Sequence, residues 1–313
     1  MLISYSVVKL ASRRACVWTR LTTSIVDTLE RANWMQRHVA LEVLRMLIDT
    51  FKRSALLALI VLLMFSVHVE AGHLEDIAAR GTIRIGTTGD YIPMSWLNPA
   101  TNQYEGIDAE LSQIIADSLG VAIEYVPTTW STLAADMQAD KFDIALCGIS
   151  RNFARAKSMA MSDAYGKGLF GKTILCRKAD AKKFKTIADL NKPTVRVMIN
   201  PGGTNEKFAR ANLSNATLIV HDDNADIPLQ IANGHADIMI TETVEAVSWV
   251  KREPRLAAPL VDKPFAGTRH SCGILMAKGD QELLNYVNFV LAELRMDGRL
   301  EQLEIKYLGR SVN

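Results

Sequence analysis

The sequence has no large excess of basic or of acidic residues. The 313 residues hold 36 Lys and Arg against 34 Asp and Glu. Residues 1–71 carry nine of the basic and five of the acidic residues, which leaves 27 against 29, a net charge of −2, in the other 242. Nucleic-acid-binding domains usually present a basic patch or stripe. The charge balance therefore argues against a nucleic-acid partner.

Cysteine is scarce, and its spacing excludes the common metal motifs. Only Cys147, Cys176 and Cys272 follow residue 71, each in an apolar run and too far apart for a CxxC-type site. Three histidines of the later chain, His221, His235 and His270, show no ligand spacing and no Ser or Cys partner motif. We expect no metal site, no catalytic cysteine and no triad. The three thiols are expected to be buried and free, with a Cys176–Cys272 disulfide as the alternative in an exported protein.

A long hydrophobic run is also missing. The apolar run at residues 54–67 has fourteen residues, fewer than the roughly 18–20 that span a bilayer. Lys52 and Arg53 precede it, and the small residues Val69 and Ala71 follow. This pattern predicts a signal peptide over about residues 46–71, cleaved after Ala71, and hence a periplasmic protein without a stable membrane anchor. Two interpretations of the preceding segment stay open: a start assigned too early, with Met46 as the natural start, or a cytoplasmic extension before a signal anchor.

The rest of the chain alternates between strand and helix patterns, without an internal repeat or a low-complexity linker. Strands are predicted at residues 82–87, 122–126, 143–147, 172–176, 194–199, 217–220, 238–240 and 271–276. Helices are predicted at residues 108–119, 132–139, 186–190, 205–211, 227–232, 244–251 and 281–307. This alternation indicates βαβ units and an α/β fold with mixed or parallel sheets.

Two such series without a linker predict two lobes in close contact. After a targeting region at residues 1–71, we assign residues 72–168 to lobe 1, 169–269 to lobe 2 and 270–313 to the return into lobe 1. The chain is expected to cross between lobes near residues 166–171 and 265–271. Ligands of open α/β sheets bind outside the carboxyl ends of the strands, so the facing lobes would form a cleft that closes by hinge motion.

The strongest local signal for a binding site is the run Asn-Pro-Gly-Gly-Thr-Asn-Glu at residues 200–206, between a strand and a helix. Its two glycines let the backbone approach a ligand closely, and a helix N-terminus attracts anions. Thr204 is expected to act as cap and donor. The run predicts a seat for a small carboxylate or phosphate, against the alternative of an ordinary turn with a Thr cap.

Other candidates follow the ends of neighbouring predicted strands. Arg155 could bind a carboxylate with two hydrogen bonds, although a solvated arginine at a helix start is the commoner case. Trp130 follows another strand, where a core position is the commoner fate. Glu242 and Glu245, three residues apart, are expected to share a helix face. Either could be a general acid if burial raises its pKa, but the sequence alone favours a solvated, Glu-rich helix start.

Several motifs together resemble the family 3 extracellular solute-binding proteins over about residues 76–309. They are the run at residues 81–91, Gly106-Ile107-Asp108, the segment at residues 142–145, and Ser150 with Asn152 and Arg155. The resemblance implies a periplasmic-binding-protein type II fold. It also implies that Arg155 and Thr204 hold the α-carboxylate of a ligand.

The run at residues 200–213, with Thr88-Gly89-Asp90-Tyr91 and Pro127-Thr128-x-Trp130, is similar to the enzyme branch of that family, the cyclohexadienyl dehydratases. The resemblance implies conversion of prephenate to phenylpyruvate, and of arogenate to phenylalanine, without a metal or organic cofactor. Glu245 then matches the general acid. The substrate-binding residues implied are Asp90, Trp130, Ser150, Arg155, Lys172, Asn200, Thr204 and Asn205.

Two positions depart from the pattern of the dehydratase branch. That branch has Asp where Glu242 stands, which puts the use of arogenate in doubt, and the register around Lys172 is ambiguous. The alternative function is a non-catalytic amino-acid-binding protein of an ABC transporter; a sensory binding domain is a third. The sequence does not choose between prephenate and arogenate, and it is compatible with a monomer or a homo-oligomer.

Overall fold

The structure is a computed structural model, and it describes residues 34–64 and 73–308. The chain divides into two compact units, Met1–Glu70 and Ala71–Asn313. In the first unit the structure describes one helix, α2 (Trp34–Met64). No helix in the described residues combines the length and apolarity that crossing a membrane requires. The predicted cleavage point after Ala71 lies outside the described residues, as does the end of the apolar run.

The second unit contains a first lobe built on a five-stranded sheet. The strand order is β5-β1-β6-β15-β7, in which β1 runs parallel to both β5 and β6, while β15 is antiparallel to its neighbours. The strands are β1 (Thr82–Thr87), β5 (Ala122–Pro127), β6 (Ile144–Ala145), β7 (Ala160–Met161) and β15 (Leu275–Met276). The helices are α3 (His73–Arg80), α4 (Ile107–Leu119), α5 (Leu133–Gln138), α6 (Phe153–Ser158), α11 (Gln281–Met296) and α12 (Arg299–Leu308). The apolar faces of β1, α4 and α11 meet in one buried cluster.

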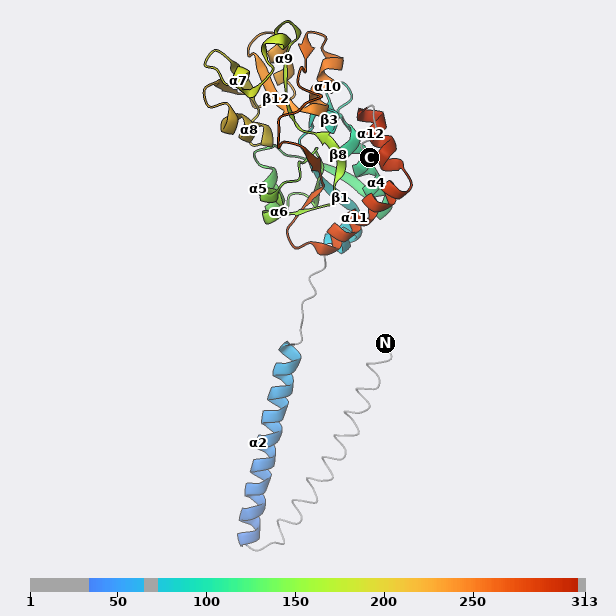
Figure 1. The fold of residues 1–313 in the computed structure, drawn as a ribbon. Coiled ribbons are helices and arrows are strands. Elements are labelled where there is room, and N and C mark those ends of the chain that lie inside the picture. The colour runs from blue at the N-terminus through green and yellow to red at the C-terminus, as the bar shows by residue number, and fades with distance from the viewer. Residues whose placement is uncertain (1–33, 65–72, 309–313) are drawn as a thin grey trace. The chain divides into compact units, whose positions relative to one another are not determined.

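The second lobe, which lies around strand β12 in Figure 1, has its own five-stranded sheet, of order β11-β10-β12-β9-β13. Here β10 is parallel to β11 and β12, whereas β9 is antiparallel to both of its neighbours. The strands are β9 (Lys172–Arg177), β10 (Arg196–Ile199), β11 (Thr217–Val220), β12 (Ile238–Glu242) and β13 (Leu256–Ala257). The helices are η1 (Lys178–Lys183), α7 (Ile187–Leu190), α8 (Thr204–Asn212), α9 (Ile227–Ala232) and α10 (Thr243–Arg252). Separate apolar clusters cover the two faces of this sheet.

Two strands lie next to each other where the chain passes between the lobes. Strand β8 (Tyr165–Phe170) pairs antiparallel with β14 (His270–Cys272). The sequence predicted one strand over residues 271–276, and that prediction was wrong. The chain leaves β14 and re-enters the first lobe as the separate strand β15, because Gly273 N donates to Ile149 O and not to a sheet neighbour.

Other elements also differ from the prediction, and α3, α6, η1, β7, β8 and β13 were not predicted at all. The small antiparallel sheet of β2 (Asp90–Tyr91), β3 (Ser95–Asn98) and β4 (Gln103–Glu105) was not predicted. The predicted helix over residues 281–307 is two helices, since Gly298 has a φ of +79° and breaks the run between α11 and α12. Strand β6 is also shorter than predicted. Cys147, Cys176 and Cys272 are buried free thiols, as expected, and they lie in three different apolar clusters.

Candidate active site

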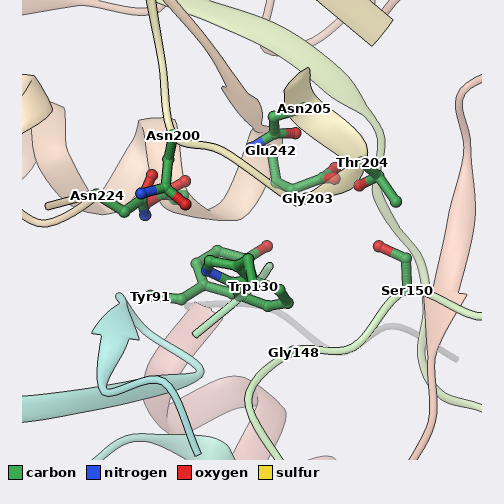
Figure 2. A pocket seen from close by; sticks show the side chains of 11 residues that line it. Tyr91, Trp130, Gly148, Ser150, Asn200, Gly203, Thr204, Asn205, Asn224 and Glu242 are labelled. Carbon is green, nitrogen blue, oxygen red and sulfur yellow. The ribbon is translucent and has the colours of Figure 1, made fainter. Parts of the chain in front are cut away.

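A pocket lies between the two sheets, at the ends of strands from both lobes. The first lobe supplies residues that follow the carboxyl ends of β1, β5 and β6, and the second lobe supplies residues that follow β10, β11 and β12. The pocket contains roughly 400 Å³ of space when the part that is open to solvent is included. Its lining residues are Tyr91, Trp130, Gly148, Ser150, Asn200, Gly203, Thr204, Asn205, Asn224, Glu242 and Glu245 (Figure 2).

The loop at residues 200–206 forms one wall of this pocket. Gly203 is the N-cap of α8, with φ −85° and ψ −178° and no side-chain cap. The prediction that Thr204 caps the helix is therefore wrong, because Thr204 is the first helical residue. At Gly202 φ is +90°, and a Cβ would lie 2.3 Å from the Cα of Ser131 in the first lobe. Only glycine lets the two lobes approach so closely here.

Lys172 lies at the centre of the polar contacts in the second lobe. It begins β9 directly opposite Glu242, the last residue of β12, so the strand register brings the two side chains together. Its Nζ donates to the carboxylate of Glu242, and to Thr204 Oγ1 and Asn205 Oδ1 at 2.6 Å each. Both members of this ion pair are buried, with side chains 6 % and 5 % exposed. Asn200 is held separately, because its Nδ2 donates to Asp222 O at 2.7 Å.

The first lobe contributes a second cation behind the pocket wall. Arg155 Nη1 donates to Ser150 O at 2.9 Å, and Ser150 lines the pocket. The structure shows no ion pair between Arg155 and any carboxylate in the residues that it describes. Burial lowers the pKa of this guanidinium, because it disfavours the charged form. Arg155 itself is not one of the lining side chains.

Two aromatic side chains form the opposite side of the pocket (Figure 2). Tyr91 and Trp130 meet edge to face, with ring centroids 6.1 Å apart. Trp130 Nε1 donates to Asp90 Oδ1 at 3.1 Å, which holds the indole ring in place. Asp90 is therefore a positioning residue for Trp130, and burial raises its pKa. Trp130 forms part of the pocket, so the commoner core position does not apply to it.

Glu245 is the most perturbed acid of the pocket. It lies in the first turn of α10, is 1 % exposed, and accepts hydrogen bonds from Thr241 Oγ1 and, at 3.1 Å, from Asn224 Nδ2. Burial raises the pKa of this carboxyl to about 8, against the smaller opposing effect of the two hydrogen bonds. The carboxyl group is therefore protonated at neutral pH. A protonated carboxyl facing a pocket is able to act as a general acid.

The sequence interpretation of the two glutamates was wrong in two respects. Glu242 ends β12 and serves as N-cap of α10, so it does not share a helix face with Glu245. Neither side chain is solvated, because the strand end and the start of the helix are both buried between the lobes. The two carboxyls nevertheless line the same pocket, one paired with Lys172 and the other protonated.

The structure thus brings most of the predicted site residues together. Trp130, Ser150, Asn200, Thr204, Asn205 and Glu245 line the pocket. Lys172, Asp90 and Arg155 contact lining residues from behind, and Lys172 and Thr204 also border a wider open groove next to the pocket.

Sequence reasoning missed three polar groups of the site. Asn224 and Thr241 hold Glu245, and the hydroxyl of Tyr91 is buried without a hydrogen-bond partner in the described part of the chain. Thr241 could have been found, since it stands four residues before Glu245, just ahead of the predicted helix. Asn224 follows β11 at its carboxyl end, but an Asn in a loop gives no signal of its own.

The arrangement favours an organic acid and proton transfer to it. Two cations, a protonated carboxyl, and several amide and hydroxyl groups converge on an aromatic surface. Within residues 34–64 and 73–308, no three His, Cys, Asp or Glu side chains gather as metal ligands do.

Comparison with known proteins gives one family and two kinds of relative. Residues 83–310 match the bacterial extracellular solute-binding proteins, family 3. The cyclohexadienyl dehydratase of Pseudomonas aeruginosa is 39 % identical over 212 residues, which are 68 % of this chain and 78 % of that protein. The L-cystine-binding protein TcyJ of Escherichia coli is 28 % identical over 244 residues, 78 % of this chain and 88 % of that protein.

Solved structures agree with this grouping. An ancestral amino-acid-binding protein, described as a precursor of cyclohexadienyl dehydratase, has a TM-score of 0.69 at 36 % identity and covers 75 % of this chain and 99 % of its own. The arginine-bound ABC-transporter substrate-binding protein AbpA of Streptococcus pneumoniae has a TM-score of 0.69 at 26 % identity, covering 76 % and 99 %. Both of these structures are of amino-acid-binding proteins, and they share the fold of this chain.

Proposed function

The chain belongs to the bacterial extracellular solute-binding proteins of family 3, and we propose that within this family it is a cyclohexadienyl dehydratase that converts prephenate to phenylpyruvate. The observation that carries the proposal is Glu245, a buried carboxyl that lines the pocket with its pKa raised to about 8. A binding protein does not need a protonated acid in its pocket. An enzyme that must protonate a leaving hydroxyl does.

The reaction needs one proton and releases two small molecules. Glu245 donates its proton to the ring hydroxyl of prephenate, and the carbon–oxygen bond breaks to release water. The bond between the ring and its carboxylate breaks as well, and its electron pair enters the ring as carbon dioxide leaves. The ring becomes aromatic, which drives the reaction, and Glu245 regains a proton from solvent. A general acid of this kind contributes about 10²–10⁴-fold in rate.

The remaining groups of the pocket suit the other parts of this substrate. Prephenate carries two carboxylates. Arg155 of the first lobe is a cation without a carboxylate partner in the described residues, whereas Lys172 of the second lobe is already paired with Glu242. The Thr204 hydroxyl and the amide of Asn200 add neutral hydrogen-bonding groups. Tyr91 and Trp130 offer an apolar surface for the ring. This chemistry requires no metal and no organic cofactor.

A second candidate function is transporter-linked amino-acid binding without catalysis. The observation in its favour is the similarity to TcyJ and to AbpA, whose names state binding roles. It requires a pocket that takes an amino acid tightly and returns it unchanged. The protonated Glu245 is the feature that separates the two functions.

We also assign the mature protein to the periplasm, because the family is extracellular and residues 46–71 have the pattern of a cleavable signal. N-terminal sequencing of the exported protein checks this assignment. The expected first residue is Gly72.

Incubation of purified protein with prephenate tests the proposal. We expect phenylpyruvate from the wild type and a loss of rate of at least about 10²-fold in Glu245→Gln, which keeps the shape but cannot donate the same proton. Glu253→Gln is the matched control, since Glu253 is the C-cap of the same helix and lies outside the pocket. No phenylpyruvate beyond the spontaneous rate in the wild type would rule the enzyme out.

A further inference from the structure

The pocket already contains an ammonium group of the protein's own. Lys172 Nζ has three oxygen acceptors, on Glu242, Thr204 and Asn205. An ammonium group has three N–H donors, so all three are used. The α-ammonium of an amino acid would bind to the same kind of acceptors, a carboxylate with neutral oxygens beside it.

No other carboxylate at the pocket is open to a ligand cation. In the described chain, two acidic side chains line the pocket, Glu242 and Glu245. Burial keeps Glu245 protonated at neutral pH. Asp90, next to the pocket, accepts the N–H of Trp130 and is not one of the lining residues. The negative charge of Glu242 is neutralised by Lys172.

The ion pair therefore offers a ligand ammonium no net negative charge. The charges of Lys172 and Glu242 cancel, and Arg155 is a half-buried cation behind Ser150. The second oxygen of Glu242 has no hydrogen-bond partner in the part of the chain described, so it could still accept one donor. A ligand ammonium there would place a second cation beside Lys172 against one carboxylate. The binding of an amino acid is therefore opposed by the positive charge of Lys172, and not by a lack of hydrogen-bond acceptors.

We propose that Lys172, paired with Glu242, is the specificity-determining residue of the pocket: its ammonium takes the place of a ligand ammonium, so that the site binds an α-keto acid in preference to the corresponding α-amino acid. In terms of substrate, and resting on the proposed function, the protein uses prephenate in preference to arogenate. The binding preference itself does not depend on catalysis.

Calorimetry with phenylpyruvate and L-phenylalanine on the full chain tests the inference. We expect the wild type to bind phenylpyruvate at least tenfold more tightly than phenylalanine. In Lys172→Met the ratio should shift toward phenylalanine by at least tenfold, because Glu242 then keeps only the imidazole of His270, 3.7 Å away, as a basic neighbour and can accept the ligand ammonium. Lys251→Met, on α10 and outside this pocket, should keep the wild-type ratio.

A second variant covers the case in which the single variant does not fold. Lys172→Met combined with Glu242→Gln removes both charges and leaves no buried carboxylate unpaired, and it should bind the two ligands within about threefold of each other. Equal binding by the wild type, or a preserved tenfold preference in the double variant, would overturn the inference. If the wild type prefers phenylpyruvate but does not turn over prephenate, the dehydratase proposal fails and this inference stands. If the wild type turns over prephenate and arogenate equally well, the dehydratase proposal stands and this inference fails.

Discussion

At the scale of single residues, the protonation state of Glu245 sets the pH dependence of the proposed reaction. The pKa of its carboxyl is about 8, raised mainly by burial. A general acid works only while protonated. We therefore expect kcat to be nearly constant below about pH 7 and to fall as the pH rises through about 8, measured from initial rates of phenylpyruvate formation. A kcat that increases over this range would show that the ionised form is the active one.

Thr241 should affect the pH at which kcat falls, because its hydroxyl donates to Glu245 and lowers the pKa of that carboxyl. Thr241→Val removes the donor, and we expect the pH at which kcat falls to rise by about 0.5–1 unit. A hydrogen bond contributes about 1 kcal/mol, and one pKa unit corresponds to 1.36 kcal/mol. Thr173→Val is the control. Thr173 lies directly opposite Thr241 in β9 and is equally buried, and its hydroxyl has no partner in the described chain. If kcat fell at the same pH in both variants, the Thr241 hydroxyl would not influence the pKa of Glu245.

At the scale of elements, the start of α8 decides how closely the two lobes approach. A Cβ at Gly202 would lie 2.3 Å from Ser131 Cα and 2.4 Å from Ser131 N. We expect Gly202→Ala to raise KM for prephenate at least tenfold, because this contact holds the two walls of the pocket together. Gly234→Ala is the control for backbone strain, with a φ of +85° and only an ordinary contact of 3.9 Å between its added Cβ and Arg177 Nη1. Gly234→Ala should lose about 1–2 kcal/mol of stability from the left-handed backbone alone, and Gly202→Ala should lose more, because its Cβ also meets the backbone of Ser131. An unchanged KM in Gly202→Ala would contradict the contact's role.

The same elements show how far sequence reasoning reaches. Strand β1 and helix α4 were predicted almost to the residue, because their apolar periodicity reports burial on one face. The hairpin of β2 to β4 was missed, since strands of two to four residues carry too little pattern. The break at Gly298 was missed because an apolar stripe continues on both sides of it.

The site was predicted less completely than the sheets. The loop at residues 200–206 was found from its glycines, and Glu245 from the resemblance. Lys172 was ambiguous, because its role depends on the antiparallel register that places it opposite Glu242. Burial of the two glutamates could not be read from a Glu-rich helix start, because the facing lobe that covers them is remote in sequence.

At the scale of the whole molecule, the raised pKa of Glu245 links stability to pH. The folded protein holds this proton up to about pH 8, whereas an unfolded Glu releases it near its model value of 4.5. The folded state thus binds more protons between these values, and the contribution of Glu245 to stability declines as the pH rises through that window. In urea unfolding, the free energy of unfolding of Glu245→Gln, relative to that of the wild type, should increase from pH 5 to pH 9.

Glu253 provides the matched comparison for this linkage. Its pKa is lowered to about 2, chiefly by the hydrogen bond from Arg255, so its contribution is lost only as the pH falls below its unfolded value. Glu253→Gln should therefore differ from wild type by a constant amount between pH 5 and pH 9. A constant difference for Glu245→Gln as well would mean that Glu245 is ionised in the folded protein.

The central claim is that one protonated glutamate, buried between two lobes of a solute-binding fold, makes this protein an enzyme. The most direct test measures carbon dioxide and phenylpyruvate together during incubation with prephenate at pH 7. The account predicts equal amounts of both products at a rate well above the spontaneous one, and a loss of both in Glu245→Gln. Tight binding of the ligand with no release of either product by the wild type would contradict it.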